Sequence, residues 1–273
     1  MFNTPLFKLK NISIKLEYLN PAGSIKDRPA LFMIKDAFFK GYNEIVEATS
    51  GNTGIALAFY SKKFNIKATI FMPKNYSIER QKILKLFGAN LILTDGDMKE
   101  CIKKAKEYAN QNNAYFTNQF ENPLNPLSHE ITALEIINQT QKIDYFVSGV
   151  GSGGTISGIA KILKPLGVKI IAVEPKNSPV IYNKLKNKNL PINTHKIQGI
   201  GAGFIPKILD LSLIDDVILI DDQEAIKFTK KLPNMGIRGG ISTAANILAS
   251  KKLKGEILTI APDSIEKYIS TFQ

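Results

Sequence analysis

The sequence predicts an α/β fold built on mostly parallel sheets, and three observations lead to this prediction. Short apolar runs rich in β-branched residues recur along the whole chain of 273 residues. Segments with helical periodicity lie between most of these runs, and strands that alternate with helices in this way are typical of βαβ units. The runs are almost continuously apolar, as expected of strands that helices cover on both faces.

The predicted strands are short, and each precedes or follows a turn rich in glycine or polar residues. They cover Glu44–Ala48, Lys67–Met72, Asn90–Thr94, Tyr145–Ser148, Lys169–Val173, Val217–Ile220 and Glu256–Ile260. The predicted helices cover Gly54–Phe64, Ile78–Phe87, Met98–Asn110, Glu130–Asn138, Ile156–Leu163 and Ala225–Leu232. The stretch from Phe120 to Pro126 contains two prolines and is the best candidate for a crossing between two domains.

The net charge of +12 does not by itself predict a nucleic-acid-binding protein. Arginine is the preferred residue for bidentate contacts with phosphate and guanine, and the chain has only three arginines, Arg28, Arg80 and Arg238. The lysines are spread through nearly every predicted helix. We therefore expect no nucleic-acid partner.

The composition also bears on location. Cys101 is the only cysteine, which excludes an internal disulfide framework. No apolar stretch approaches the roughly 18 residues that a membrane span needs, and the N-terminus lacks the pattern of a signal peptide. We expect a cytoplasmic protein without a membrane partner. Cys101 falls on an apolar helical stripe, so we expect it to be buried, and His129 and His195 have no metal-ligand spacing.

Lys26 is distinguished from the other lysines by its neighbours in the chain. Ser24 and Asp27 have the S-x-x-D spacing of a capping box, and Pro29 suits the first turn of a helix. Lys26 is therefore predicted at a helix N-terminus, where the helix dipole disfavours the protonated amine. A partly neutral lysine suits Schiff-base chemistry, although a solvated lysine beside a helix cap would have the same local pattern.

A glycine-rich turn, Gly149-Val150-Gly151-Ser152-Gly153-Gly154-Thr155, follows the predicted strand Tyr145–Ser148 and precedes an apolar helix. Glycines let backbone N–H groups approach an anion closely, and the helix N-terminus adds its dipole. The hydroxyls of Ser152 and Thr155 supply further donors. The turn therefore predicts a phosphate site.

The same turn leaves a second interpretation open. Gly149, Gly151 and Gly154 satisfy the G-x-G-x-x-G pattern, and Glu174 follows 20 residues after the last of them. A dinucleotide site would have its ribose-binding acid at this spacing. An NAD-dependent oxidoreductase is thus an alternative on this segment, but it gives no role to Lys26.

Two further polar segments follow predicted strands. The first packs hydroxyls and an amide around a glycine at a helix start, which favours binding of a carboxylate, through Thr49, Ser50, Gly51, Asn52 and Thr53. The second, Ala261-Pro262-Asp263-Ser264, ends in a serine that could contact a ligand or cap the next helix. Ligands of parallel sheets bind at the carboxyl ends of strands, where all these segments lie.

These segments, in this order, resemble the cysteine synthase (O-acetylserine sulfhydrylase) and cystathionine β-synthase family of pyridoxal-phosphate enzymes, of the tryptophan-synthase-β fold (fold type II). The resemblance covers nearly the whole chain. Further matching motifs are Asn3-Thr4-Pro5-Leu6, Ser77-Ile78-Glu79-Arg80 and the run from His195 to Pro206. The family fold implies two three-layer αβα domains with mostly parallel sheets and the cofactor in the cleft between them. We place the smaller domain at residues 21–125 and the larger at 1–20 plus 126–273.

The resemblance implies a role for each motif. Lys26 would form the Schiff base with pyridoxal 5′-phosphate and later move the Cα proton. The 5′-phosphate would bind to Gly151, Ser152, Gly153, Gly154 and Thr155. Asn52 would hydrogen-bond the 3′-oxygen of the ring, and Ser264 would face the pyridine nitrogen. The substrate carboxylate would bind to Thr49, Ser50, Gly51, Asn52, Thr53 and Gln119.

The implied reaction converts O-acetyl-L-serine and sulfide to L-cysteine and acetate through an α-aminoacrylate intermediate. A relative that uses cysteine or serine as donor, and releases sulfide or forms a thioether, is the alternative within the same chemistry. A non-catalytic protein on this fold would not require Lys26, Asn52, Gln119 and Ser264 together. The family also implies a homodimer, with the tail of a serine acetyltransferase as a possible partner.

Overall fold

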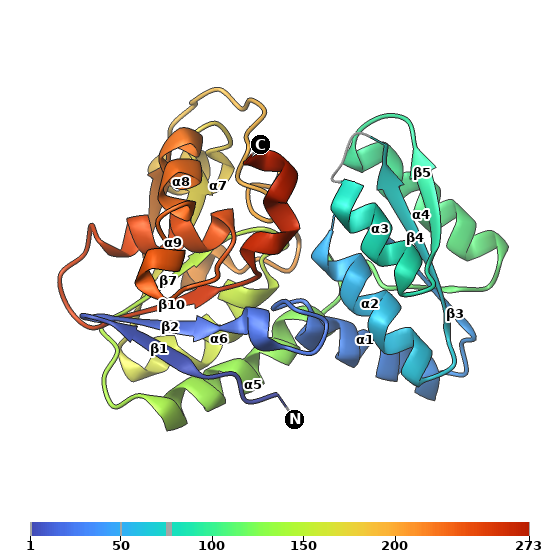
Figure 1. Ribbon diagram of the computed structural model, residues 1–273, viewed down its shortest axis with the longest axis horizontal. Helices are drawn as coiled ribbons and strands as arrows, with labels where there is room; N and C mark the ends of the chain where they lie inside the picture. Colours follow the sequence, from blue (N-terminus) through green and yellow to red (C-terminus); the bar gives the residue numbers. More distant parts are fainter. Residues whose placement is uncertain (1, 50, 75–77, 273) are drawn as a thin grey trace.

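The computed structural model describes residues 2–49, 51–74 and 78–272 and contains two sheets with helices packed on both faces (Figure 1). Within these residues, one sheet has six strands in the order β1-β2-β10-β7-β8-β9, and the other has four in the order β5-β4-β3-β6. Only β1 and β2 pair antiparallel among the described strands. The prediction of an α/β fold with mostly parallel sheets is confirmed.

We call the half of the molecule built on the larger sheet the six-stranded lobe. Its strands are β1 (Leu6–Leu9), β2 (Ile12–Leu16), β7 (Tyr145–Gly149), β8 (Lys169–Pro175), β9 (Asp216–Ile220) and β10 (Ile257–Ala261). Its helices are α5 (Leu124–Gln139), α6 (Gly154–Leu163), α7 (Val180–Lys186), α8 (Asp222–Thr229) and α9 (Ile241–Ser250). Short 3-10 helices are η1 (Glu17–Leu19), η2 (Lys164–Leu166), η3 (Leu211–Leu213), η4 (Pro233–Met235) and η5 (Ile265–Thr271).

The other half, the four-stranded lobe, is continuous in sequence. Its strands are β3 (Glu44–Ala48), β4 (Lys67–Pro73), β5 (Asn90–Thr94) and β6 (Tyr115–Phe116). Its helices are α1 (Asp27–Phe39), α2 (Asn52–Lys63), α3 (Ile78–Leu86) and α4 (Met98–Gln111). Because α1 also packs against α5 of the six-stranded lobe, the sheets alone do not define a boundary. The division into 21–125 and 1–20 plus 126–273 stays a prediction.

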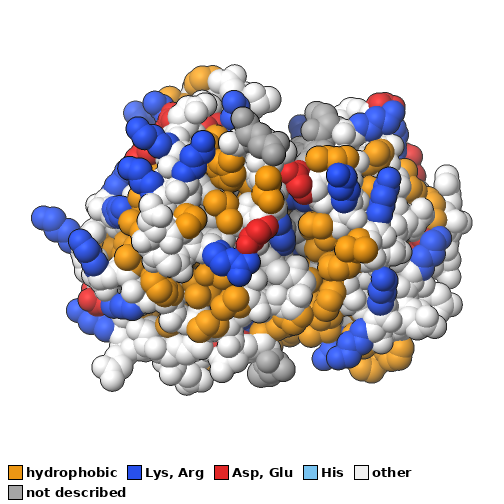
Figure 2. Space-filling view, in the orientation of Figure 1, with side chains coloured by type: hydrophobic (Ala, Val, Ile, Leu, Met, Phe, Trp, Pro, Cys, Tyr) orange, Lys and Arg blue, Asp and Glu red, His pale blue; other side chains and the backbone are white. Residues whose placement is uncertain are grey.

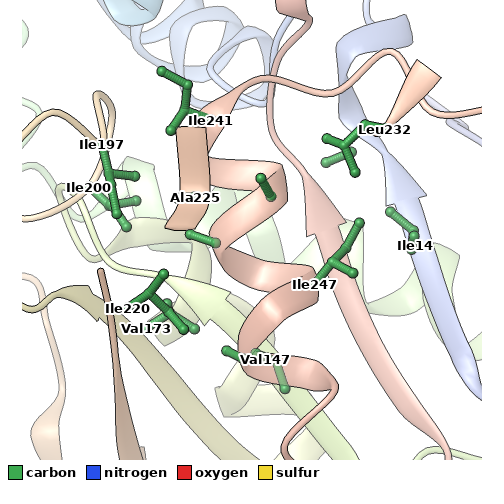
Figure 3. Close-up of a cluster of buried hydrophobic side chains, with 14 of the residues drawn as sticks. Ile14, Val147, Val173, Ile197, Ile200, Ile220, Ala225, Leu232, Ile241 and Ile247 are labelled. Carbon is green, nitrogen blue, oxygen red and sulfur yellow. The ribbon is translucent and has the colours of Figure 1, made fainter. Parts of the chain in front are cut away.

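Helices cover both faces of each sheet, and this explains why most of the strands carry apolar residues on both faces. In β3, Ile45 packs toward α1 and α2, whereas the next residue, Val46, packs toward α4. In β7, Phe146 and Val147 are divided in the same way between two core clusters. Figure 3 shows the cluster on the Val147 face, where α9 lies across the sheet. Successive side chains of a strand point to opposite faces, so both must be apolar here.

Every strand and helix predicted from an apolar run is present, with boundary differences of a few residues. The largest boundary difference is in α5, which starts at Leu124, six residues before the predicted start at Glu130. The prediction gave α1 (Asp27–Phe39) only by its start and gave no range for β1, β2, β6, α7 and α9. In β2 the continuous apolar run that marks the other strands is interrupted by Lys15, a lysine that is fully buried and paired with Glu135 at 2.9 Å.

A buried charge cluster joins the N-terminal segment, α1 and α5. The Arg28 guanidinium forms ion pairs with Glu17 at 2.7 Å and with Glu135 at 2.8 Å. Lys15 completes the cluster through Glu135, and Thr4 donates to Glu17 at 2.7 Å. Removal of one partner from a buried ion pair leaves an uncompensated charge, which costs about 3–5 kcal/mol. The cluster therefore holds the start of α1 in place against the six-stranded lobe.

We expect Leu258→Ala in β10 to lower the free energy of unfolding by about 2–5 kcal/mol, because Leu258 is fully buried between β2 and β7. The matched control is Leu86→Ala at the end of α3, where the leucine is 76% exposed and the change should stay within about 0.5 kcal/mol. Urea denaturation followed by circular dichroism measures both. Equal midpoints for the two variants would contradict the assigned core.

Candidate active site

A cavity of about 340 Å³ lies between the two lobes. Its walls bring together most of the residues that the sequence singled out: Lys26, Thr49, Gly51, Asn52, Thr53, Gln119, Gly151, Ser152, Gly153 and Thr155. The motifs follow β3 and β7, one strand from each sheet, so the carboxyl ends of both sheets face the same cavity, as expected for parallel sheets. Gly154 lies in the same turn without lining the cavity, and Ser50 lies outside the described residues.

Lys26 directly precedes α1, as predicted, but the capping box is only half formed. The Asp27 carboxylate accepts from the Ser24 N–H at 3.1 Å. The Ser24 hydroxyl, however, accepts from the Lys26 N–H at 3.3 Å and not from the N–H of Asp27. Lys26 itself is the N-cap residue, with no side-chain hydrogen bond to the helix. Ser24 therefore forms a tight turn before the helix, and this turn sets the direction of the Lys26 side chain.

The Lys26 amine faces the glycine-rich turn and has a lowered pKa. Its Nζ donates to the Ser152 hydroxyl at 3.3 Å, across the two lobes. Burial lowers the pKa of Lys26 to about 8, while the nearby carboxylate of Glu47 raises it. The direction agrees with the prediction, but the main physical cause is desolvation, where the sequence suggested the helix dipole. A substantial fraction of the amine is neutral near pH 8.

The glycine-rich turn requires glycine at several positions, because of its backbone conformation and its close protein neighbours. Gly153 adopts a left-handed backbone with φ of +86° at the start of α6. A Cβ on Gly151 would collide with the carbonyl oxygen of Gly199, and one on Gly154 with the Asn125 amide. The first N–H groups of α6 have no partner within the helix, so they are available to a phosphate.

Two buried side chains support this turn from behind. Asn125 donates from Nδ2 to the Ser152 hydroxyl at 3.0 Å. His129 contacts the Thr155 hydroxyl through Nε2 at 3.3 Å, and burial holds its pKa well below the usual value. A neutral imidazole orients Thr155 without adding charge. His129 thus lies next to the site but does not line the cavity.

The predicted carboxylate loop is organised by Glu47 and Gln119. Thr53 donates its hydroxyl to Gln119 Oε1 at 2.7 Å, and the Thr49 hydroxyl accepts from the Gly51 N–H at 3.1 Å. The buried Glu47 carboxylate accepts from the Gln119 N–H at 3.0 Å, and burial raises the pKa of Glu47 to about 7. The hydroxyls and amides at the start of α2 thus face the cavity from a rigid frame.

Ser264 does not line the cavity, although its neighbour Asp263 does. Ser264 is the N-cap residue of η5, without a side-chain hydrogen bond to that helix. Its backbone pairs with that of Gly239 in an isolated β-bridge. Its contact with the pyridine nitrogen stays a prediction.

Several cavity residues were missed by the sequence reasoning. Arg80 of α3 is 2% exposed and lines the cavity beside Gly51. Ser242 also lines the cavity, from the first turn of α9. A buried arginine cannot be told from a surface arginine by its local sequence. For Ser242, the preceding Gly239-Gly240 pair was the available signal.

Cys101 is fully buried in α4, within the apolar cluster that covers β3. The described residues contain no group of three or more metal-ligating side chains. In the described ranges, no helix is both long and apolar enough to cross a lipid bilayer. On the face of the molecule that Figure 2 shows, lysine and arginine side chains are dispersed over both lobes.

Glu174 has a role that differs from the one expected in a dinucleotide site. It ends β8, and its carboxylate accepts from the N–H of Ile181 at 2.9 Å and of Tyr182 at 2.8 Å. These are unpaired donors at the start of α7, so Glu174 caps that helix. Because both oxygens of the Glu174 carboxylate are already bonded to α7, they are not free to bind a ribose, as the NAD alternative requires.

The chain belongs to the family of pyridoxal-phosphate-dependent enzymes, whose family model matches residues 1–263. Within that family, the sequence is 47% identical to a cysteine synthase of Buchnera aphidicola (subspecies Schizaphis graminum) over 296 aligned residues. The match covers 98% of this chain and 92% of the relative. The resemblance inferred from the motifs is therefore confirmed.

Solved structures agree with this assignment. The crystal structure of a cysteine synthase from Entamoeba histolytica matches with a TM-score of 0.90 and 39% identity, over 99% of this chain and 88% of that one. A hydrogen sulfide-producing enzyme from Fusobacterium nucleatum matches with a TM-score of 0.88 and 41% identity, over 97% and 96%. The fold is thus that of fold type II pyridoxal-phosphate enzymes.

We expect the Lys26 amine to titrate with a midpoint near pH 8, and Glu47→Gln to move this midpoint lower. The sign follows from the charge: the Glu47 carboxylate stabilises the ammonium form, and its removal makes the amine easier to deprotonate. Labelling of the cofactor-free protein with acetic anhydride at a series of pH values, read by mass spectrometry at Lys26, measures the midpoint. Glu130→Gln on α5 is the control. A midpoint that rises in Glu47→Gln would exclude this coupling.

Proposed function

We propose that this protein is a pyridoxal-phosphate-dependent cysteine synthase, which converts O-acetyl-L-serine and sulfide to L-cysteine and acetate. The observation that carries the proposal is the position of Lys26. Its amine has a lowered pKa and bonds to the hydroxyl of Ser152 in the glycine-rich turn. The carboxylate loop on α2 lines the same cavity. The identity with cysteine synthases over nearly the whole chain supports the same reaction.

The residues present fit pyridoxal 5′-phosphate. Gly151 and Gly154 lie where any side chain would collide with neighbouring protein atoms, so the turn consists of bare backbone at these positions. The N–H groups at the start of α6 can then donate to a phosphate. Lys26 would hold the cofactor through its amine, and Gly151, Ser152, Gly153, Gly154 and Thr155 would hold the phosphate. When bound, the cofactor supplies an electron sink for charge that develops at the substrate Cα.

The protein's own groups then have separate tasks. Thr49, Gly51, Thr53 and Gln119 would bind and orient the substrate carboxylate. Lys26, once its amine is free, would take the proton from the substrate Cα, for which a pKa near the working pH is suited. Glu47 lies near the Lys26 amine, and its carboxylate keeps Gln119 in place by accepting a hydrogen bond from the Gln119 N–H. The buried Glu47 thus interacts with both the residue that would move the proton, Lys26, and a residue that would orient the substrate, Gln119.

A second candidate is release of sulfide from cysteine, or formation of a thioether, at the same site. It is favoured by the similarity to the hydrogen sulfide-producing enzyme of Fusobacterium nucleatum. The residues that bind the amino-acid part would serve both reactions. The difference between them concerns the donor's leaving group and the second substrate.

Three further proposals come from the family resemblance. We propose that the chain acts as a homodimer in the cytoplasm, and that the tail of a serine acetyltransferase is a partner. The exposed leucines and isoleucine of α5, at positions 127, 134 and 137, offer an apolar surface to a second copy. Sedimentation in solution tests the dimer.

Lys26→Ala should abolish turnover and covalent cofactor attachment while the protein still folds, because few structural contacts involve the amine. The visible absorption spectrum, activity and circular dichroism together measure this. Lys35→Ala, an exposed lysine of α1, is the matched control and should behave as the wild type. Substantial cysteine formation by Lys26→Ala would contradict the assignment.

The donor is tested by the visible spectrum of the purified protein. We expect a yellow protein whose band shifts when O-acetylserine is added and returns when sulfide follows, because elimination and addition are separate steps. A band that ignores O-acetylserine but responds to cysteine or serine would support the second candidate. A colourless protein that pyridoxal phosphate does not restore would overturn the proposed function.

A further inference from the structure

The Asn52 side chain, at the start of α2, is held at both ends of its carboxamide. Lys267 of η5 donates from Nζ to Asn52 Oδ1 at 3.0 Å. Asn52 donates from Nδ2 to Asp263 Oδ2 at 2.7 Å. An ammonium group only donates and an ionised carboxylate only accepts, so these two contacts allow a single orientation of the amide.

Lys267 is placed to do this because it is tied to a second point in the site. Its Nζ also donates to the carbonyl oxygen of Gly23 at 2.9 Å, three residues before Lys26. Lys267 is only 7% exposed. Burial lowers the pKa of Lys267, whereas Asp263, Asp27 and Glu266 raise it and Arg80 lowers it. One buried lysine thus connects the Lys26 turn, the start of α2 and the C-terminal segment.

Asp263 is fixed in turn by its own neighbours. It is 1% exposed, and its Oδ2 also accepts from the Tyr268 hydroxyl at 2.6 Å. The Arg80 guanidinium lies 5.2 Å from the centre of the Tyr268 ring. We call Lys267 and Asp263, which hold the two ends of the Asn52 carboxamide, the Asn52 clamp. Both residues belong to η5 or the segment just before it, which lies between the two lobes in Figure 1.

This clamp determines what Asn52 presents to a ligand. Asn52 lines the cavity, its oxygen accepts from Lys267, and one amide hydrogen bonds to Asp263. The second amide hydrogen has no acceptor among the described residues. Only a hydrogen-bond acceptor on the ligand can satisfy it. Without the clamp, rotation of the carboxamide would present its oxygen, which repels an oxygen acceptor.

We propose that Lys267 is a positioning residue which, together with Asp263, fixes the Asn52 carboxamide as a hydrogen-bond donor to the ring oxygen of the cofactor. The inference rests on the proposed function, because the acceptor is the 3′-oxygen of pyridoxal 5′-phosphate. Lys267 acts through Asn52 and also links this contact to the turn that carries Lys26.

The experiment compares two ligands that differ only at this oxygen. Full-length protein freed of cofactor is titrated with pyridoxal 5′-phosphate and with its 3-deoxy analogue, for the wild type and for Lys267→Met. Methionine keeps much of the length of the side chain and removes the donor. We expect Lys267→Met to bind pyridoxal 5′-phosphate at least tenfold more weakly, and the 3-deoxy analogue within twofold of the wild type. Lys254→Met, an exposed lysine with the same change in net charge, should change neither.

A purely structural role for Lys267 would weaken both ligands alike, and that result would overturn the inference, as would unchanged binding of both. Lys267→Arg keeps a cationic N–H donor and should restore most of the preference for pyridoxal 5′-phosphate. If Lys267→Met does not fold, Lys267→Leu, which is shorter and also has no donor, gives the same comparison. Failure of the wild type to bind pyridoxal 5′-phosphate would instead refute the proposed function, so the two failures are distinguishable.

Discussion

The buried ion pairs of Arg28 are the interaction on which the rest of the site depends. Arg28 follows Lys26 by two residues, and its contacts with Glu17 and Glu135 attach the start of α1 to the six-stranded lobe. An isolated helix start would leave the Lys26 amine free to move. Because the guanidinium is desolvated, it has few alternative partners, so the helix has one position relative to the glycine-rich turn. The hydrogen bond from Lys26 to Ser152 across the two lobes follows from that position.

Much of the fold could be predicted from the sequence because it depends on local patterns. Strands such as β3 and β7 are covered on both faces and carry adjacent apolar residues at their centres, Ile45-Val46 and Phe146-Val147, and this pattern is visible without the structure. The glycine-rich turn and the polar start of α2 were also visible, since their chemistry depends on consecutive residues. Both segments line the cavity as expected.

The rest depends on contacts between residues far apart in the chain. β2 was missed because Lys15 is polar, and only its distant partner Glu135 makes it suitable for a core. The low pKa of Lys26 was expected from the helix dipole, yet burial against the other lobe is the larger cause. Ser264 was expected at the site from motif order, whereas its neighbour Asp263 is the residue of that segment that lines the cavity. Arg80 has no local sequence signal that would place it on a cavity wall.

The position of β10 has a consequence for how the molecule is made. This strand lies between β2 and β7, so the last strand of the chain is an inner strand of the six-stranded sheet. During synthesis, the N-terminal strands and Lys26 leave the ribosome first, but their sheet stays divided until residues 257–261 arrive. Long-range pairings of this kind form late. The four-stranded lobe, whose strands are continuous in sequence, is therefore able to fold before residues 257–261 arrive, and the six-stranded side of the cavity is completed only after they pair.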